Sequence, residues 1–208
     1  MFKIYNNMKK IKYFLMSILF IVSASSCNDA IDIVQDGELG NDVTFQTVGD
    51  LNEFLLGGVY SNLSSSAEIG FTTVFTDEVG VGPSNLGQGI ELHRFNLNAS
   101  TGDASALWLQ HYRLINRVNR LIEGAALVTP IVDLDAEPAI DETADYNNIL
   151  AQARTLRAYA YIQLLSYFST DMSDDSALGV MLVDFVPKID QKFPRVTNGE
   201  IFALVEAD

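Results

Sequence analysis

Apolar residues recur at spacings of three and four in four stretches of this chain, and that spacing places them on one face of an α-helix. The predicted helices run from Thr47 to Leu63, from about Ser105 to Ala125, from about Thr143 to Ser169, and from Thr197 onward. Thr197 and Glu200 form the Ser/Thr-x-x-Glu capping box that marks a helix start. The pattern therefore predicts an all-α fold.

The third stretch carries apolar residues on two sides. It contains no Gly or Pro between residues 149 and 168 and is rich in strong helix formers. Its apolar residues form two rows, which are Ile149, Ala153, Leu156, Ala160, Leu164 and Tyr167, and then Ala158, Tyr161, Leu165 and Phe168. A helix with two apolar rows packs on two sides, as helices do in the middle of a repeat stack. We therefore expect Leu156 and Ala160 to be fully buried.

The segments between these helices have the composition of loops. Residues 64–104 contain many glycines and are expected to form a long loop with a short extended piece from Phe71 to Phe75. Residues 129–142 form a linker that bears Pro and Asp, and residues 170–194 are predicted to be a further loop.

The amino terminus has the pattern of a secretory signal. Lysines precede an apolar run from Tyr13 to Ala24, which is shorter than the roughly 20 residues that span a bilayer. Met8 begins a more conventional version of this signal, so translation from Met1 and translation from Met8 are both open.

Cys27 is the only cysteine of the chain and directly follows the small residues that end this signal. A lone thiol in an exported protein requires an explanation, and lipid attachment supplies one. We predict that residues 1–26 are a lipoprotein signal peptide, that Cys27 is the lipid attachment residue, and that residues 27–46 are an extended tether. The alternative is an ordinary signal peptide with an incidental cysteine.

The chain is strongly acidic, with 27 Asp and Glu residues against 13 Lys and Arg residues and a net charge of −14. Four of the lysines lie in the predicted signal, so the mature protein is more acidic still. Such a surface repels nucleic acids and anionic lipid headgroups. We expect no nucleic-acid partner, and ligands that are neutral or cationic rather than anionic.

Sequence motifs for catalysis and for metal or phosphate binding are absent. The two histidines, His93 and His111, have no companion at metal-ligand spacing, and His111 is expected to be a satisfied histidine on a helix. Adjacent carboxylates such as Asp77 and Glu78 point to opposite faces of an extended segment, so they cannot flank one glycosidic bond. We predict no enzymatic activity, no metal site and no cofactor.

A structural role for these two carboxylates is expected instead. Arginines on a helix that packs on two sides need a carboxylate partner, and Arg154 and Arg157 lie on the third predicted helix. We expect the carboxylates at 77 and 78 to pair with one of these arginines, unless the arginines are exposed to solvent.

Two groups of residues are candidates for ligand binding. Trp108, Tyr112, Ile115 and Asn119 recur at helical spacing, and a stripe of this kind belongs most often to the core. The loop from residue 77 to 98 instead combines amide, basic and aromatic side chains, and binding residues concentrate in such loops. The ligand-binding candidates in this loop are Asn85, Gln88, His93, Arg94 and Phe95.

Four pieces of sequence carry a family resemblance. In chain order they are the signal that ends at Cys27, the pattern Trp108-x-x-x-Tyr112-x-x-Ile115-Asn116-x-x-Asn119, the helix AQARTLRAYAYIQLLSYF at 151–168, and Pro194-Arg195-Val196-Thr197, which is expected to open the last helix. Together they resemble the SusD/RagB family of outer-membrane nutrient-binding lipoproteins, and the resemblance spans nearly the whole chain.

The resemblance implies a tetratricopeptide-like helical repeat stack with long irregular loops. It implies that residues 47–208 are the amino-terminal helical domain of a longer protein, and that the ligand site also draws on the missing carboxyl-terminal part. It further implies a lipid anchor in the outer membrane of a member of the Bacteroidetes, with the protein exposed on the cell surface.

The function that the resemblance implies is the binding of an oligomeric nutrient, expected to be a glycan. The nutrient would then pass to a SusC-like TonB-dependent transporter in the outer membrane. A RagB-like binder of peptides is one alternative. A lipid-anchored helical scaffold for protein partners is another, because the signal and the helices fit it equally well.

Overall fold

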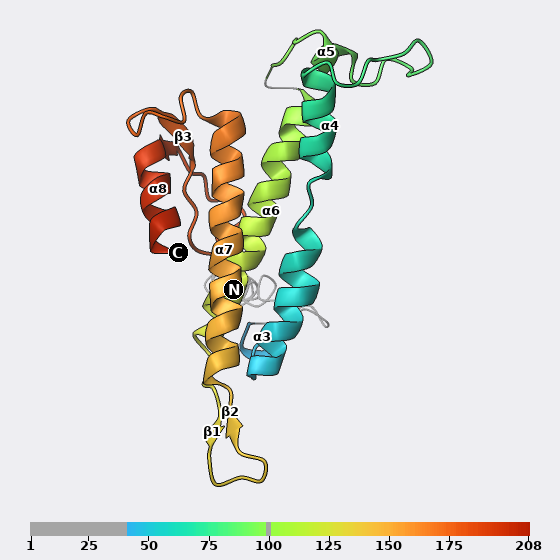
Figure 1. Cartoon of the computed structure of the whole chain (residues 1–208). Helices are drawn as coiled ribbons and strands as arrows, with labels where there is room; N and C mark the ends of the chain where they lie inside the picture. Colours follow the sequence, from blue (N-terminus) through green and yellow to red (C-terminus); the bar gives the residue numbers. More distant parts are fainter. Residues whose placement is uncertain (1–40, 99–100) are drawn as a thin grey trace, which may run out of the picture. The chain divides into compact units, whose positions relative to one another are not determined.

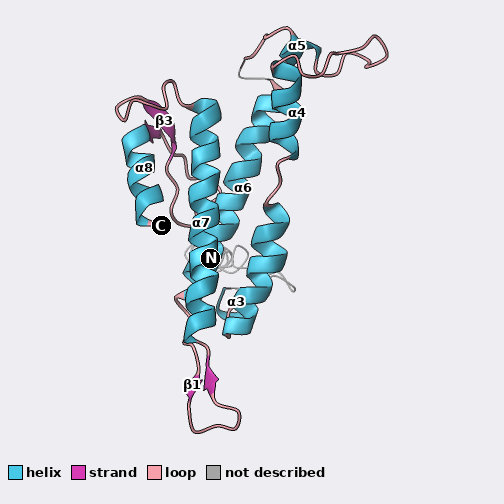
Figure 2. Ribbon diagram, in the orientation of Figure 1, coloured by secondary structure: helices cyan, strands magenta, loops and turns pink. Residues whose placement is uncertain are grey.

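The computed structural model describes residues 41–98 and 101–208, which belong to a compact unit that spans Gly40–Asp208. The predicted signal peptide, Cys27 and most of the predicted tether lie outside the described residues. Figure 1 shows the arrangement of the elements and Figure 2 shows that helices dominate it.

The helices with α-helical geometry are α2 (Asn41–Thr44), α3 (Val48–Phe54), α4 (Ser66–Phe75), α5 (Ile90–His93), α6 (Gly102–Ala125), α7 (Thr143–Phe168) and α8 (Asn198–Ala207). A π-helical turn, η1 (Leu55–Val59), and a 3₁₀ turn, η2 (Tyr60–Asn62), follow α3 directly. The strands are β1 (Val132–Asp133), β2 (Ile140–Asp141), β3 (Leu178–Met181) and β4 (Arg195–Thr197). They pair as antiparallel β1–β2 and β3–β4.

The long helices α6 and α7 lie antiparallel and side by side, and the β1–β2 hairpin joins them at one end (Figure 1). α3 and α4 pack against α6, and α8 packs against α7 together with β3. One apolar core runs through these layers, and its buried members include Leu51, Val118, Leu164 and Ile201. The predicted all-α, tetratricopeptide-like stack is confirmed. None of the described helices combines the length and the apolarity needed to cross a bilayer.

α7 packs on two sides, as its two apolar rows predict. Ala160 and Leu164 of the first row and Tyr161 and Leu165 of the second are fully buried. Leu156 is only half-buried, so the prediction of its full burial was wrong. The neighbouring Arg157 takes the buried place instead, because its guanidinium has partners inside the fold.

The first predicted helix is real but changes geometry along its length. Thr47 and Asp50 form a capping box at its start, with the Asp50 amide donating to the Thr47 hydroxyl at 3.1 Å. The glycine pair Gly57–Gly58 lies within the π-helical turn η1. Glycine has little preference for α-helical backbone, so the turn widens where helix propensity is weakest.

Several segments predicted as loops carry regular structure. The piece from Phe71 to Phe75, expected to be extended, belongs to helix α4, because packing against α6 outweighs the strand preference of Phe, Thr and Val. The 129–142 linker contains the β1–β2 hairpin, and β3 lies within the predicted 170–194 loop. Within the predicted tether, α2 forms and Phe45 is buried in the core.

The capping box that was predicted to start the last helix is confirmed. The Glu200 amide donates to the Thr197 hydroxyl at 3.3 Å, and the Glu200 carboxylate accepts from the Thr197 amide at 2.9 Å. The three residues Arg195–Thr197 form strand β4 rather than a first helical turn, since they pair with β3. Ile201 of α8 is fully buried, so this helix belongs to the core of the unit.

A close approach at Gly124 generates a stability prediction. A Cβ atom added at Gly124 would overlap the ring of the buried Phe45, whereas one added at the exposed Gly57 would have open space around it. Gly124→Ala should therefore overpack the core and lower the free energy of unfolding by about 1–3 kcal/mol. Gly57→Ala, the matched control, should be neutral or stabilising by up to about 1 kcal/mol. Urea denaturation of both variants measures the difference, and equal effects would contradict the packing described here.

Candidate ligand-binding site

An aromatic cavity of about 590 Å³ lies between the amino-terminal part of α6, the carboxyl-terminal end of α7 and helix α4. Its walls combine four aromatic rings with a few small and polar residues. The lining residues are Phe71, Leu97, Asn98, Ala104, Ser105, Trp108, Leu109, Tyr167 and Phe168. A hollow of this size and apolar character suits a small ligand or one unit of a longer one.

The rings around the aromatic cavity hold one another in position. Trp108 packs edge-on against Phe168 with ring centroids 5.0 Å apart, and its other neighbour is Tyr112 at 4.9 Å. Phe71 of α4 packs edge-on against Tyr167 of α7 at 5.8 Å. Edge-to-face contacts of this kind add about 0.5–1.5 kcal/mol each beyond burial, so the aromatic walls are preformed.

A buried polar pair fastens α4, which supplies Phe71, to α6. His111 Nε2 of α6 lies 3.0 Å from Glu68 Oε1 of α4, and both side chains are almost completely buried. The second carboxylate oxygen of Glu68 accepts a hydrogen bond of 2.8 Å from Gln110. Burial lowers the pKa of His111 below its ordinary value of 6.5, although the neighbouring Glu68 carboxylate acts in the opposite direction. The two atoms of the pair, His111 Nε2 and Glu68 Oε1, approach each other without hydrogen-bond geometry, so both remain buried without a hydrogen-bond partner, and the expectation of a satisfied histidine is not met.

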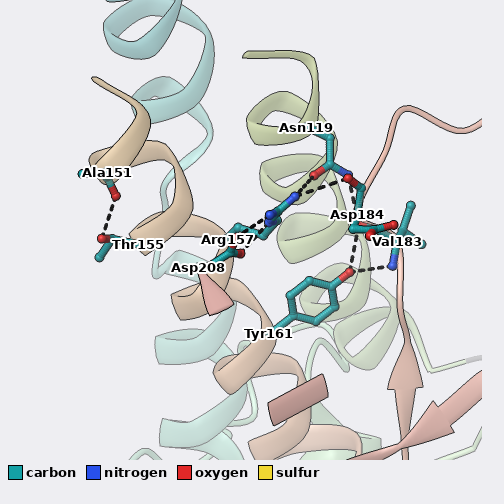
Figure 3. A network of polar contacts seen from close by, with 8 residues as sticks. All are labelled: Asn119, Ala151, Thr155, Arg157, Tyr161, Val183, Asp184 and Asp208. Carbon is teal, nitrogen blue, oxygen red and sulfur yellow. Dashed lines mark hydrogen bonds and ion pairs between the residues drawn. The ribbon is translucent and has the colours of Figure 1, made fainter. Parts of the chain in front are cut away.

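A second polar network fastens α6 and α7 to the extended segment that follows β3. Figure 3 shows Arg157 of α7 at its centre, facing Asn119 of α6 and Asp208 after α8. Arg157 Nη1 donates to Asn119 Oδ1 at 2.9 Å, Nε donates to Asp208 Oδ2 at 2.6 Å, and Nη2 forms a further ion pair with Asp208. The two charged side chains are 7% and 5% exposed, so the pair is shielded from water.

The extended segment itself is held through its backbone. Asn119 Nδ2 donates to the carbonyls of Val183 and Phe185 at 3.0 and 2.9 Å. The Tyr161 hydroxyl both donates to the Val183 carbonyl and accepts from its amide (Figure 3). The Tyr112 hydroxyl donates to the Met181 carbonyl at 2.7 Å. Burial raises the pKa of Tyr161 to about 12, so its hydroxyl stays protonated near neutral pH.

The residues of the predicted stripe have different roles, although they share one face of α6; they are Trp108, Tyr112, Ile115 and Asn119. Ile115 is buried in the core as predicted, but Trp108 lines the aromatic cavity and Asn119 is a buried hydrogen-bonding residue. Arg195 links β3 to the end of α7, because its guanidinium donates to the Gly179 carbonyl at 2.6 Å and to the last carbonyl of α7. A cation at the end of a helix also complements the helix dipole.

None of the five candidate residues of the loop lines the aromatic cavity. Asn85 and Gln88 bond each other across a turn, and His93 Nδ1 lies 3.3 Å from Asp77 Oδ1. Arg94 is exposed, and Phe95 packs its half-exposed ring edge-on against Phe75 at 5.1 Å. Phe75 stacks on Phe71 of the cavity wall, which connects Phe95 to the site through a row of rings. A ligand contact for these five residues stays a prediction.

The expected pairing of Asp77 or Glu78 with Arg154 or Arg157 was wrong. Asp77 faces His93, and Arg157 pairs with Asp208, which is far from it in sequence but adjacent in the fold. Among the residues that the structure describes, no group of three or more His, Cys, Asp or Glu side chains is placed to hold a metal ion.

The fold was compared with those of known proteins. No protein-family model and no curated protein matches the chain. Solved structures do match, beginning with a SusD superfamily protein from Bacteroides fragilis at a TM-score of 0.60 and 18% identity, over 79% of this chain and 38% of that one. The chain has the fold of the SusD superfamily.

Two further solved structures share the SusD fold. A protein assigned as sugar-binding from Bacteroides vulgatus matches at a TM-score of 0.60 and 24% identity, over 79% of this chain and 36% of that one. A SusD superfamily protein from Bacteroides thetaiotaomicron matches at 0.56 and 20% identity, over 77% and 35% of the two chains. The chain thus spans little more than a third of the length of these relatives, and the resemblance predicted from four sequence pieces is confirmed in the fold.

The backbone bonds of Tyr161 give a stability prediction. Tyr161→Phe would leave the buried amide and carbonyl of Val183 without their shared partner, which should cost about 1–3 kcal/mol of unfolding free energy. Tyr60→Phe is the matched control, because the Tyr60 hydroxyl bonds Gln152 at the surface and its loss should cost less than about 0.5 kcal/mol. Chemical denaturation of both variants provides the measurement. A Tyr161 variant as stable as the Tyr60 variant would mean that the extended segment is held by other contacts.

The buried pair between α4 and α6 predicts a pH dependence. Because the pKa of His111 is lowered in the folded state, the unfolded chain takes up this proton first as pH falls through 6.5. The melting temperature should therefore decrease as the pH is lowered from about 7.5 to about 5.5, which is roughly one unit on either side of the ordinary histidine pKa. In His111→Gln this decrease should be smaller. His93→Gln, which alters the only other histidine, should keep it. A pH profile that is unchanged in His111→Gln would exclude this histidine as its source.

Proposed function

We propose that this chain belongs to a SusD-type surface lipoprotein that binds a glycan. The observation that supports this proposal is the aromatic cavity, on a fold shared with a protein assigned as sugar-binding. The rings of the cavity are those of Phe71, Trp108, Tyr167 and Phe168. Sugars offer apolar C–H faces that stack on aromatic rings and hydroxyls that need polar partners. The rings of the cavity supply the first kind of contact, and the Ser105 hydroxyl and the polar loop beside the cavity supply the second.

Delivery to a transporter is the second part of the proposal. The protein would be anchored in the outer membrane by lipid on Cys27, face the outside of the cell, and pass its ligand to a SusC-like TonB-dependent transporter. The signal sequence and the shared fold support this role. The protein acts in this proposal by binding rather than by catalysis, and the loop residues 85–95 would contact the same ligand at the rim of the cavity.

Trp108 makes ligand binding directly measurable, because it is the only tryptophan of the chain and lines the aromatic cavity. The full chain would be titrated with neutral and acidic oligosaccharides and with short peptides while Trp108 fluorescence is recorded. A saturable change with an oligosaccharide supports the proposal. Saturation by peptides alone would favour a RagB-like peptide binder, and no response to either class would favour a scaffold for protein partners.

A blocking variant tests whether the aromatic cavity is the site. Ser105→Arg places a long side chain in the cavity without removing a core contact, because Ser105 is exposed. It should weaken oligosaccharide binding by about tenfold or more, since each tenfold corresponds to about 1.4 kcal/mol. Ala151→Arg, on the exposed face of α7 and outside the cavity, makes the same change in charge and should bind as the parent chain does. Equal affinity of the two variants would place the ligand elsewhere.

A further inference from the structure

Three arginines line one exposed stripe of α6. Arg113, Arg117 and Arg120 follow one another at spacings of four and three, so their side chains emerge on the same face. Arg120 Nε bonds Asn116 Oδ1 at 3.1 Å, and no described carboxylate forms an ion pair with any of the three. Like charges at this spacing repel one another. The three arginines lack an ion-pair partner among the described residues although the chain carries 27 acidic residues. The stripe is therefore a local positive surface on an acidic protein.

The arginines border a groove rather than a flat surface. A hollow of about 450 Å³ is lined by Asn62, Leu109, Tyr112, Arg113, Asn116, Arg117 and Arg120. It offers planar guanidinium groups, two side-chain amides and one aromatic ring within a small volume. Guanidinium forks bind carboxylates and sulfates through paired hydrogen bonds, while amides and rings suit the hydroxyls and apolar faces of a sugar.

This arginine groove adjoins the aromatic cavity through shared lining residues. Leu109 lines both, and its side chain is 52% exposed. An intermediate hollow shares Ser105 with the aromatic cavity and shares Asn62 and Arg113 with the arginine groove. These three adjoining hollows follow α6 from Trp108 to Arg120 and together are called the trough. A trough of this kind fits a chain-like ligand better than a compact one.

We propose that the trough binds an anionic oligosaccharide, with uronate or sulfated units over the arginine groove and an uncharged face in the aromatic cavity. The inference rests on the proposed glycan binding and adds the charge class of the ligand. It revises the expectation of neutral or cationic ligands, which followed from net charge alone. A folded protein partner fits less well, because stable protein interfaces bury about 800 Å² on each side, whereas the hollow has the volume of a small-ligand site.

The test compares a charged glycan with its uncharged ester and adds a sulfated glycan of different backbone. Oligogalacturonate, its methyl ester and chondroitin sulfate would be titrated into the full chain by calorimetry, with poly-glutamate as an acidic polymer that is not a sugar. At least one of the two charged glycans should bind more tightly than the methyl ester, and its affinity should fall with added salt. Arg113→Gln with Arg117→Gln should weaken that binding by about tenfold or more. Arg154→Gln, an exposed arginine on α7 outside the trough, should leave it unchanged.

The outcomes separate this inference from the proposed function. Neutral and charged glycans bound equally well, or an unchanged affinity in the double variant, would overturn the inference and leave glycan binding intact. Poly-glutamate bound as tightly as the charged glycans, with the same sensitivity to the double variant, would assign the arginines to acidic proteins instead. No binding of any charged glycan overturns the inference, and a lack of neutral-glycan binding as well overturns the proposed function.

Discussion

The buried guanidinium of Arg157 is the constraint on which the rest of this structure depends. A charge that is 7% exposed must be paired, because removing one partner of a buried ion pair costs about 3–5 kcal/mol. Arg157 meets this need with Asp208 after α8, with Asn119 on α6 and with the Asp184 carbonyl after β3. Parts of the chain that are distant in sequence are therefore brought to one point (Figure 3). Apolar packing alone would allow helices to slide, whereas these directional bonds fix their register.

The same network sets the geometry of the candidate site. On one side of α6, Tyr112 bonds the last residue of β3 and Asn119 bonds the segment that follows it. Trp108 lies on the same stripe one turn earlier. Phe168, which packs against Trp108, is the last residue of α7, and Arg195 bonds its carbonyl. The walls of the aromatic cavity are thus side chains of two helices whose relative position is fixed by polar contacts. Rigid walls lose little conformational entropy when a ligand binds, so less of the interaction free energy is offset by ordering of the site.

Local sequence rules predict the parts of this fold that depend on neighbours along the chain. The periodicity of α6 and α7 and the capping box at Thr197 are of this kind. Helix α4 was missed because Phe, Thr and Val favour strands, and its helical state depends on contacts with α6 such as Glu68 with His111. The partner of Arg157 could not be read from the sequence, since Asp208 lies 51 positions away and only the packed fold brings them together. A signal was nonetheless present, because an arginine within an alanine-rich, two-sided helix requires a buried partner.

Net charge is a weak basis for inferring ligand chemistry, because it averages over a surface that the fold makes uneven. α6 shows why, since a single helix of 24 residues presents different chemistry on each of its faces. One face is core, with Val118 and Leu121; a second carries Trp108 and Asn119; a third carries the three arginines. The field that a bound ligand meets is set by a few side chains within a Debye length of it, about 8–10 Å in physiological salt. A local argument from the trough along α6 therefore takes precedence over the global argument from composition.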